Sequence, residues 1–156
     1  MRQRFSVIIP YNLDLINSGR HILYRTTKDI LILYLIDRDI SLALGKQGNP
    51  STFNASEAII VTYNNIHRFG DESKRFKYQV VIATDYTNTF AILNYDRLDL
   101  NSNEVGFSEP LSCHQFTKKF TDLSDKRVLN RTSNVGRPGK HIHLLNVKNE
   151  NKCSGN

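Results

Sequence analysis

Residues 76–95 read FKYQVVIATDYTNTFAILNY, and this stretch decides the fold of the chain. Its two halves, residues 76–84 and 89–95, are rich in β-branched and aromatic residues, which favour strands. The four residues between them, DYTN at 85–88, have the composition of a turn, in which a short polar side chain such as that of Asp85 bonds nearby backbone. The stretch therefore predicts a β-hairpin.

The neighbouring segments extend the β pattern in both directions. An apolar run at residues 58–63 precedes the hairpin, and the charged residues 69–75 are expected to connect the two. Pro10 ends a strand-like run near the N-terminus, because proline cannot donate a ladder hydrogen bond. Shorter strands are predicted at 5–9, 21–25, 105–107, 114–120 and 141–147.

One segment breaks this pattern and predicts a helix over residues 26–44. Thr26 or Thr27 can cap its N-terminus, and Asp29 suits its first turn. Gly45 suits its C-terminal end. Its apolar residues recur at helical spacing, namely Leu33, Ile36, Ile40 and Leu44.

Residues 30–36 alone would also fit a buried strand. The helix is the better interpretation because the apolar period continues past the charged residues 37–39. Taken together, the patterns predict an α+β fold, mainly antiparallel β-sheet with one substantial helix near residues 27–44. The length of 156 residues suggests one domain, placed at 1–147, followed by a polar tail at 148–156.

The composition, with 39% apolar and 23% charged residues, is that of a globular protein. The longest apolar run, residues 30–36, is far shorter than the about 20 residues that span a bilayer. No signal-peptide-type stretch follows Met1, which taken literally favours a cytosolic protein. Since strand-like residues begin at 5, a fragment of a longer secreted protein would look the same.

The positive net charge of +6 is concentrated in the last third of the chain. Residues 1–110 hold 12 basic and 12 acidic residues, whereas 111–156 hold nine basic and three acidic ones. This asymmetry predicts a polyanion-facing end, with an ordinary solvated surface as the alternative. The candidate contacts are Lys118, Lys119, Lys126, Arg127, Arg131, Arg137 and Lys140.

No residue set has the spacing of a catalytic or metal site. His141 and His143 would share one face of a predicted strand, but a zinc site needs three or four ligands. Two exposed histidines on an edge strand are therefore the preferred interpretation. Cys113 next to His114 lacks a third, orienting group. We predict no catalytic residue, no metal ligand and no cofactor.

Several short motifs in order resemble one family, the NIDO domain, which is the extracellular module of nidogen, the tectorins and some membrane mucins. The resemblance runs from about residue 8 to 145. It is carried by PYNLDL at 10–15, LYR at 23–25, AIIVTY at 58–63, YQVVIATDY at 78–86, FAILNY at 90–95, VGF at 105–107 and SNVGRPG at 133–139. The motif residues that it singles out are Thr84, Asp85, Phe90, Tyr95, Gly106, Phe107, Ser133, Asn134, Gly136 and Gly139.

The chain departs from the family pattern in a systematic way. It has no tryptophan, and the positions where the family usually carries one hold Asn12, Tyr63, Leu100 and His141. Tyr86 stands where the family has a turn glycine. Because a non-glycine residue at positive φ is disfavoured, we expect the turn type to differ here.

The resemblance implies a non-catalytic extracellular binding module of a larger adhesion or matrix-type protein. Its expected partners are an extracellular-matrix or cell-surface protein and a sulfated glycan, with no nucleic acid. In a secreted protein, Asn54 and Asn130 head glycosylation sequons, and Cys113 is expected to pair with Cys153.

Two other functions stay open at this point. The basic C-terminal third suggests an intracellular nucleic-acid-binding domain, although no RNA-reading signature with paired aromatics is present. The histidine pair suggests a metal hydrolase, which has the least support. A signal peptide and cysteine-rich repeats in the full gene would distinguish the extracellular function from the intracellular one.

Overall fold

Three long antiparallel strands form the centre of the protein: β4 (Glu57–Arg68), β5 (Asp71–Thr84) and β6 (Thr89–Leu98). The computed structural model describes residues 7–11, 15–16, 22–46, 48, 52–102, 105–108 and 118–145. The predicted hairpin is confirmed, with Thr84 opposite Thr89 and Phe90 opposite Ala83. The fold class is α+β and mainly antiparallel, as expected.

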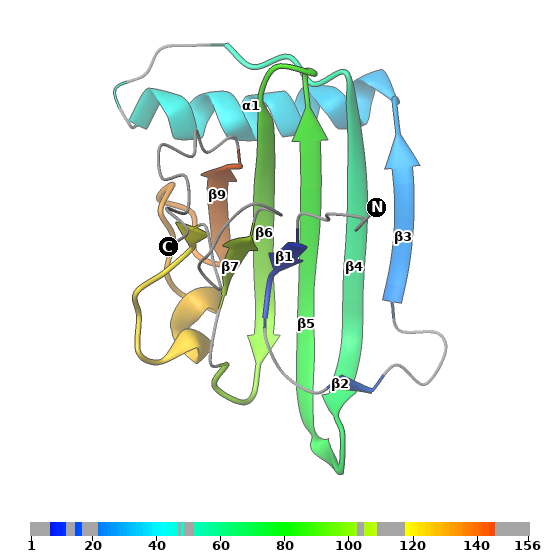
Figure 1. Cartoon of the computed structure of the whole chain (residues 1–156), viewed down its shortest axis with the longest axis vertical. Helices are drawn as coiled ribbons and strands as arrows, with labels where there is room; N and C mark the ends of the chain where they lie inside the picture. The colour runs from blue at the N-terminus through cyan, green and yellow to red at the C-terminus, as the bar shows by residue number, and fades with distance from the viewer. Residues whose placement is uncertain are drawn as a thin grey trace, which may run out of the picture.

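Shorter strands complete two sheets. In the larger sheet, β2 (Leu15–Ile16) and β3 (Ile22–Thr27) both pair with β4, and β9 (Lys140–Leu144) pairs with β6 at the opposite edge. A small second sheet has the order β1-β7-β8. Figure 1 shows helix α1 crossing one face of the large sheet near the β5–β6 hairpin, with β1 and β7 on the other face. The remaining bounds are β1 Val7–Ile9, α1 Ile30–Lys46, β7 Gly106–Ser108, β8 Lys118–Lys119 and the 3-10 helix η1 Lys126–Asn130.

The connection predicted at residues 69–75 is wrong. The chain turns at Phe69 and Gly70, and β4 and β5 extend to that turn because their charged residues face solvent at the end of the hairpin. Strand β6 continues three residues beyond Tyr95, to Leu98 opposite Phe76. The predicted strands at 114–120 and 141–147 are described only from 118 and up to 145, respectively.

The helix is confirmed, but both of its predicted ends were misplaced. Thr26 and Thr27 belong to β3, and Asp29 is the cap because its Oδ1 accepts hydrogen bonds from the N–H groups of Leu31 and Ile32 at 2.9 and 3.2 Å. The C-terminal end passes through Gly45 to Lys46, whose Nζ donates to the carbonyl of Val135 at 2.6 Å.

Helix α1 buries one stripe against the sheet. The buried residues recur at intervals of three and four, which places them on one face of a helix. They pack on alternate residues of the central strands, so the helix and the sheet form one of two cores. The helical side consists of Leu33, Ile36, Ile40 and Ala43, and the sheet side includes Ala58, Ile60, Val81, Ala83, Phe90, Ile92 and Ile142. No helix in the described part of the chain is long and apolar enough to cross a membrane.

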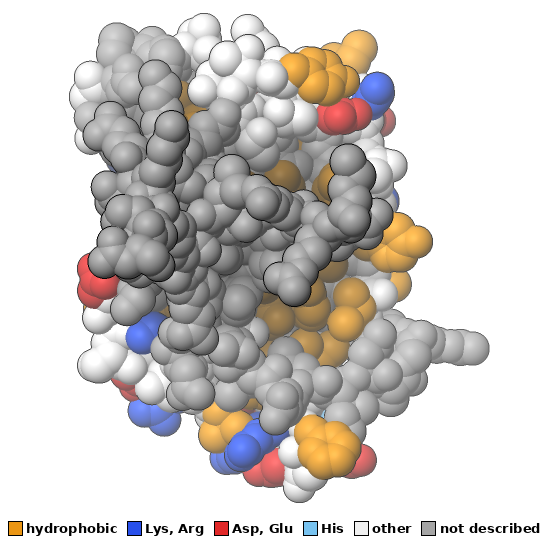
Figure 2. All heavy atoms as spheres, in the orientation of Figure 1, with side chains coloured by type: hydrophobic (Ala, Val, Ile, Leu, Met, Phe, Trp, Pro, Cys, Tyr) orange, Lys and Arg blue, Asp and Glu red, His pale blue; other side chains and the backbone are white. Residues whose placement is uncertain are grey.

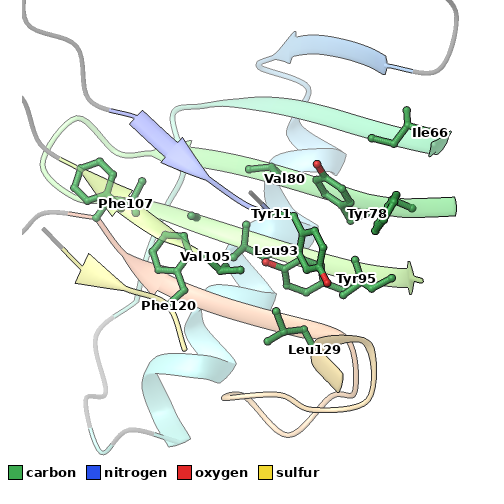
Figure 3. Packing of buried hydrophobic residues seen from close by; sticks show 14 residues of the cluster. Tyr11, Ile66, Tyr78, Val80, Leu93, Tyr95, Val105, Phe107, Phe120 and Leu129 are labelled. Carbon is green, nitrogen blue, oxygen red and sulfur yellow. The ribbon is translucent and has the colours of Figure 1, made fainter. Parts of the chain in front are cut away.

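The second core lies on the other face of the sheet and is built around Tyr11. Its ring lies 5.8 Å from that of Phe76, 6.3 Å from Tyr78 and 6.4 Å from Tyr95, measured between centroids. Tyr11 is 4% exposed, and its hydroxyl donates to the carbonyl of Leu100. Figure 3 shows this ring projecting onto the sheet from the segment that follows β1. The N-terminal segment is therefore part of the core.

The hairpin tip contradicts one expectation from the sequence. Tyr86 adopts φ +66°, the left-handed conformation that a non-glycine residue was expected to avoid. Neighbouring hydrogen bonds hold this backbone in place, because Thr84 Oγ1 accepts from the N–H of Tyr86 at 3.0 Å and Asp85 Oδ1 accepts from that of Thr87 at 2.8 Å. The strain of the tip is thus offset locally.

Replacing Tyr86 with glycine should relieve this strain. The side chain is 69% exposed, so little packing is lost. We expect Tyr86→Gly to be more stable than Tyr86→Ala by about 1 kcal/mol, because alanine keeps the Cβ that disfavours positive φ. Urea unfolding of the two variants measures the difference. Equal stabilities, or a more stable alanine variant, would contradict the observed turn conformation.

Candidate binding surface

The SNVGRPG motif at 133–139 forms a turn that is closed by its own side chains. Ser133 Oγ accepts from the N–H groups of Val135 and Arg137, both at 3.0 Å, and donates to the carbonyl of Lys140 at 2.7 Å. Asn134 exchanges two hydrogen bonds with the backbone of Ile142, at 2.8 and 2.9 Å. The polar residues of this motif are therefore used within the fold.

Gly139 ties that turn to the central sheet. Its carbonyl accepts from the N–H of Tyr95 at 2.7 Å, and its φ of +78° suits glycine. A Cβ at this position would lie 2.5 Å from the carbonyl oxygen of Tyr95, which is too close for any side chain. Gly136 also has positive φ, with the side chain of Lys46 against it.

The remaining motif residues also build the scaffold. Asp85 Oδ1 bonds the N–H groups of Thr87 and Asn88, and these bonds lower the pKa of its carboxyl although burial alone would raise it. Gly106 and Phe107 pair with β1 and β8 in the small sheet. Phe90 packs edge-on against Phe53 at 4.9 Å. The family signature therefore describes how the chain folds rather than what it contacts.

His141 and His143 share a face of β9, but the expectation that both are exposed is wrong. They are 6% and 9% exposed because β1, β7, β8 and η1 cover that face. The His141 ring stands edge-on to Tyr95 at 5.7 Å with its Nε2 3.1 Å from the carbonyl of Leu129, and the His143 ring stacks on Phe120 at 4.3 Å. Both rings belong to the aromatic core.

Within the described residues, no three histidine, cysteine, aspartate or glutamate side chains come together as metal ligands. His67 lies elsewhere, on β4 opposite Arg75. Cys113, His114 and Cys153 fall outside the described residues. The pairing of the two cysteines therefore remains a prediction.

A polar hollow lies between the end of β6 and η1. It has a volume of about 410 Å³. Three arginines and two aspartates contribute to its walls, which leaves a net charge of +1 among them. The lining residues are Arg97, Leu98, Asp99, Asp125, Arg127, Val128, Asn130 and Arg131, and we call this the arginine hollow.

Two ion pairs with the same geometry organise the arginine hollow. Arg97 bonds Asp99 through Nε and Nη2, and Arg127 bonds Asp125 in the same way, with the shortest contact at 2.7 Å in each pair. Hydrogen bonds from the Arg127 side chain and backbone lower the pKa of Asp125 to about 2. Both aspartates therefore stay ionised at neutral pH. Arg131 is exposed and forms no ion pair with the described residues.

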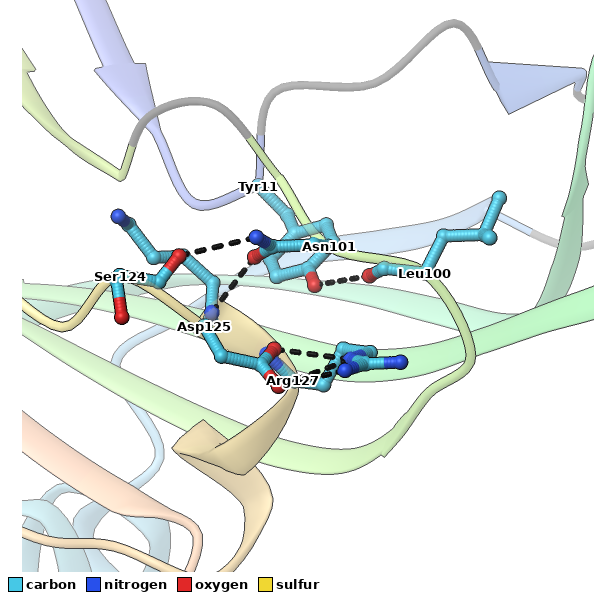
Figure 4. A network of polar contacts seen from close by, with 7 residues as sticks. Tyr11, Leu100, Asn101, Ser124, Asp125 and Arg127 are labelled. Atoms are coloured by element: carbon cyan, nitrogen blue, oxygen red, sulfur yellow. Dashed lines mark hydrogen bonds and ion pairs between the residues drawn. The ribbon is translucent and has the colours of Figure 1, made fainter.

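A polar network fastens the start of η1 to the segment that follows β6. Asn101 donates from Nδ2 to the carbonyl of Ser124 at 3.0 Å and accepts from the N–H of Lys126 at 2.7 Å. Figure 4 shows that these bonds lie beside the Tyr11–Leu100 contact and the Asp125–Arg127 pair. The position of the hollow is thus coupled to the Tyr11 core.

The seven residues predicted to contact a polyanion do not share one surface. Arg127 and Arg131 line the arginine hollow, with Lys126 adjacent in η1. Arg137 and Lys140 instead pair with Asp39 of α1, on the opposite side of the sheet. The side chain of Lys140 is only 14% exposed, because it points toward α1 from β9 and pairs there with Asp39. Lys118 and Lys119 form β8, and their side chains are outside the described part.

Arg97 and Asp99 were not among the predicted contacts. The predicted strand ended at Tyr95, and basic and acidic residues are equal in number over residues 1–110. Among the described residues on the face shown in Figure 2, basic and acidic side chains lie next to each other along the margins.

Comparison with known families gives one match. The profile of the nidogen-like domain matches residues 1–146, nearly the whole chain. No curated protein and no solved structure matches the chain.

The burial of His141 predicts a loss of stability in mild acid. Burial lowers the pKa of the imidazole, and hydrogen bonds to the carbonyls of Leu129 and Thr132 only partly oppose this. Between the lowered folded pKa and the unfolded value of about 6.5, the unfolded chain binds more protons. The free energy of unfolding should therefore fall as pH drops below about 6.5. His141→Gln should flatten this dependence in urea titrations at several pH values; an unchanged slope would contradict it.

Proposed function

Because the chain belongs to the nidogen-like domain family, we propose that it is a non-catalytic binding module of a larger adhesion or matrix-type protein. The family consists of extracellular, non-enzymatic modules. The proposed partner is an extracellular-matrix or cell-surface protein. The proposed auxiliary ligand is a sulfated glycan, held at the arginine hollow.

The observation that carries the glycan proposal is the arrangement of Arg97, Arg127 and Arg131 around one hollow. Guanidinium groups bind sulfate and carboxylate oxygens through paired hydrogen bonds, and this geometry favours arginine over lysine. Arg97 and Arg127 are already held in place by their aspartates, so they lose little conformational freedom when an anion binds. Arg131 supplies the charge that no aspartate balances.

The same arrangement implies weak and salt-dependent binding. The two aspartates offset most of the arginine charge, and all the guanidinium groups are exposed to screening. A single site of this kind suits an auxiliary contact that supports a protein partner. Nucleic acid would meet the same charges in vitro, with no specificity.

Charge substitutions in the hollow should move heparin affinity in opposite directions. Asp125→Asn keeps an acceptor for the N–H of Arg127 and removes one negative charge, so it should raise the salt needed for elution. Arg127→Gln combined with Arg131→Gln should lower the salt concentration needed for elution. The slope of log affinity against log salt concentration should become shallower by about two. Elution from a heparin column at a series of salt concentrations measures both.

A matched control distinguishes binding at the arginine hollow from an effect of net charge. Arg38→Gln combined with Arg137→Gln also removes two positive charges, but on the α1 side of the sheet, where Arg137 lies 4.0 Å from Asp39. This variant should elute close to the unmodified protein. If both double variants lose retention equally, net charge and not the hollow binds the column.

We also propose glycans at the two sequons of the secreted protein. Asn54 is exposed beside β4 and can accept one without rearrangement. Asn130 lines the arginine hollow, and its Nδ2, the atom that carries a glycan, donates to the carbonyl of Asp96 at 3.2 Å. A glycan there would crowd Arg127 and Arg131.

A Cys113–Cys153 disulfide bond, expected if the protein is secreted, remains part of the proposal.

Removing the Asn130 sequon without changing Asn130 tests this arrangement. Thr132 Oγ1 is buried and has no hydrogen-bond partner among the described residues, so Thr132→Val keeps the volume and costs little stability. Protein from a secretory host should lose one glycan and bind heparin more tightly with this change. The non-glycosylated variant should match the non-glycosylated parent. Tighter binding without loss of a glycan would contradict the explanation.

A further inference from the structure

Within the described part of the chain, strand β3 forms an unpaired edge of the large sheet. Among the described strands it pairs only with β4. Leu23 is 58% and Tyr24 82% exposed, and they point to opposite faces because neighbours on a strand alternate. Figure 2 shows hydrophobic side chains projecting at the margin where Figure 1 places β3. The edge thus presents one large exposed apolar side chain on each face.

This edge has few of the features that usually keep sheet edges from pairing with another chain. The strand reads ILYRTT over Ile22–Thr27, without proline, lysine or a bulge, and its register with β4 is regular along all six residues. Edges of this kind pair readily with another strand. Its one charge, Arg25, lies near the centre.

Shallow hollows flank the edge on both faces of the sheet. One, of about 250 Å³, lies on the α1 face and is lined by Leu23, Arg25, Ile60, Thr62 and Gln79, with Tyr24 at its border. The other, of about 220 Å³, lies on the opposite face and includes Thr26, Ile59 and Ile82. Side chains of an added strand would have space on both sides.

We propose that β3 is a homodimer interface, in which the β3 strands of two copies pair antiparallel about a two-fold axis. Paired residues must share a face of the sheet, so only registers centred on one residue are allowed. Centring on Arg25 would oppose two arginines, which is unfavourable. Centring on Tyr24 stacks the two tyrosines and sets Arg25 opposite Leu23 of the second copy. Centring on Leu23 or Thr26 would pair only three residues of the six-residue strand, whereas the Tyr24-centred register pairs residues 22–26, so it is the register that we propose.

That register also continues the rows of the existing sheet. Leu23 pairs with Thr62, Thr62 with Gln79, and Gln79 with Asn94. Gln79 donates to Thr62 at 2.9 Å, and Asn94 donates to Gln79 at 3.4 Å. Arg25 of the second copy would join this row beside Leu23, where its guanidinium meets a polar lining. The arginine hollow, next to β6 and η1, stays clear of the interface.

The size of the edge predicts a weak dimer. The exposed parts of Leu23, Tyr24 and Arg25, with the strand backbone, amount to roughly 450 Å² per copy, about half of a standard interface. We therefore expect a dissociation constant of about 10–100 µM. Two copies would double the number of arginine hollows and so strengthen binding to a long polyanion.

Sedimentation velocity of the 156-residue chain over a range of concentrations tests the proposal. The unmodified protein should dimerise, and Tyr24→Lys should raise the dissociation constant at least about tenfold without lowering thermal stability. Tyr86→Lys is the matched control, because Tyr86 is 69% exposed at the hairpin tip, and it should leave the dimer unchanged. A chain that stays monomeric at all concentrations, or a dimer equally sensitive or insensitive to both changes, would overturn the proposal.

Cysteine cross-linking tests the register separately. Under mild oxidation, Tyr24→Cys should form a disulfide between residues 24 of two copies, identified by mass spectrometry of the linked peptide. Arg25→Cys should form its symmetric cross-link much more slowly, since its partner in the proposed register is Leu23. A faster cross-link through residue 25 would overturn the register, and absence of both would overturn the interface.

Discussion

Tyr95 is the point at which the separate segments of the protein are joined. Its N–H donates to the carbonyl of Gly139 at 2.7 Å, and its hydroxyl donates to the carbonyl of Pro10 at 2.8 Å. Its ring contacts Tyr11, Tyr78 and His141. One residue of β6 thus holds the N-terminal segment, strand β5, the 133–139 turn and strand β9. Burial raises the pKa of its hydroxyl strongly, so it remains a neutral donor.

The arginine hollow depends on this junction without being part of it. Asp96 follows Tyr95 and accepts from Asn130, which anchors the end of η1. Arg97 and Asp99 follow in the same strand and form one wall. The motif residues are thus used in the scaffold, whereas the candidate contacts with other molecules lie at its margins, in the arginine hollow and along β3. Such margins can differ between proteins that share the same scaffold.

The sequence predicts the parts of this structure that rest on local chemistry. The hairpin at 76–95 and the buried stripe of α1 follow from periodicity, and the polar tip follows from Asp85. The start of α1 was harder to predict from the sequence, because pairing with β4 holds Thr26 and Thr27 in β3 and leaves Asp29 as the cap. The prediction that His141 and His143 are exposed was wrong. β9 has the sequence of an edge strand, and the segments that cover the histidine face of β9 come from distant positions in the chain. The pairing of Lys140 with Asp39, 101 residues apart, is equally invisible to local patterns.

The claim that anion binding is confined to the arginine hollow can be tested directly by NMR. A heparin-derived oligosaccharide is titrated into the isotope-labelled chain, and backbone amide shifts are followed. The account predicts shifts that concentrate at residues 97–99 and 125–131 and leave the 133–139 turn and the 85–88 tip unperturbed. Shifts centred instead on Arg137, Lys140 and α1 would contradict it, because they would place the anion on the opposite side of the sheet.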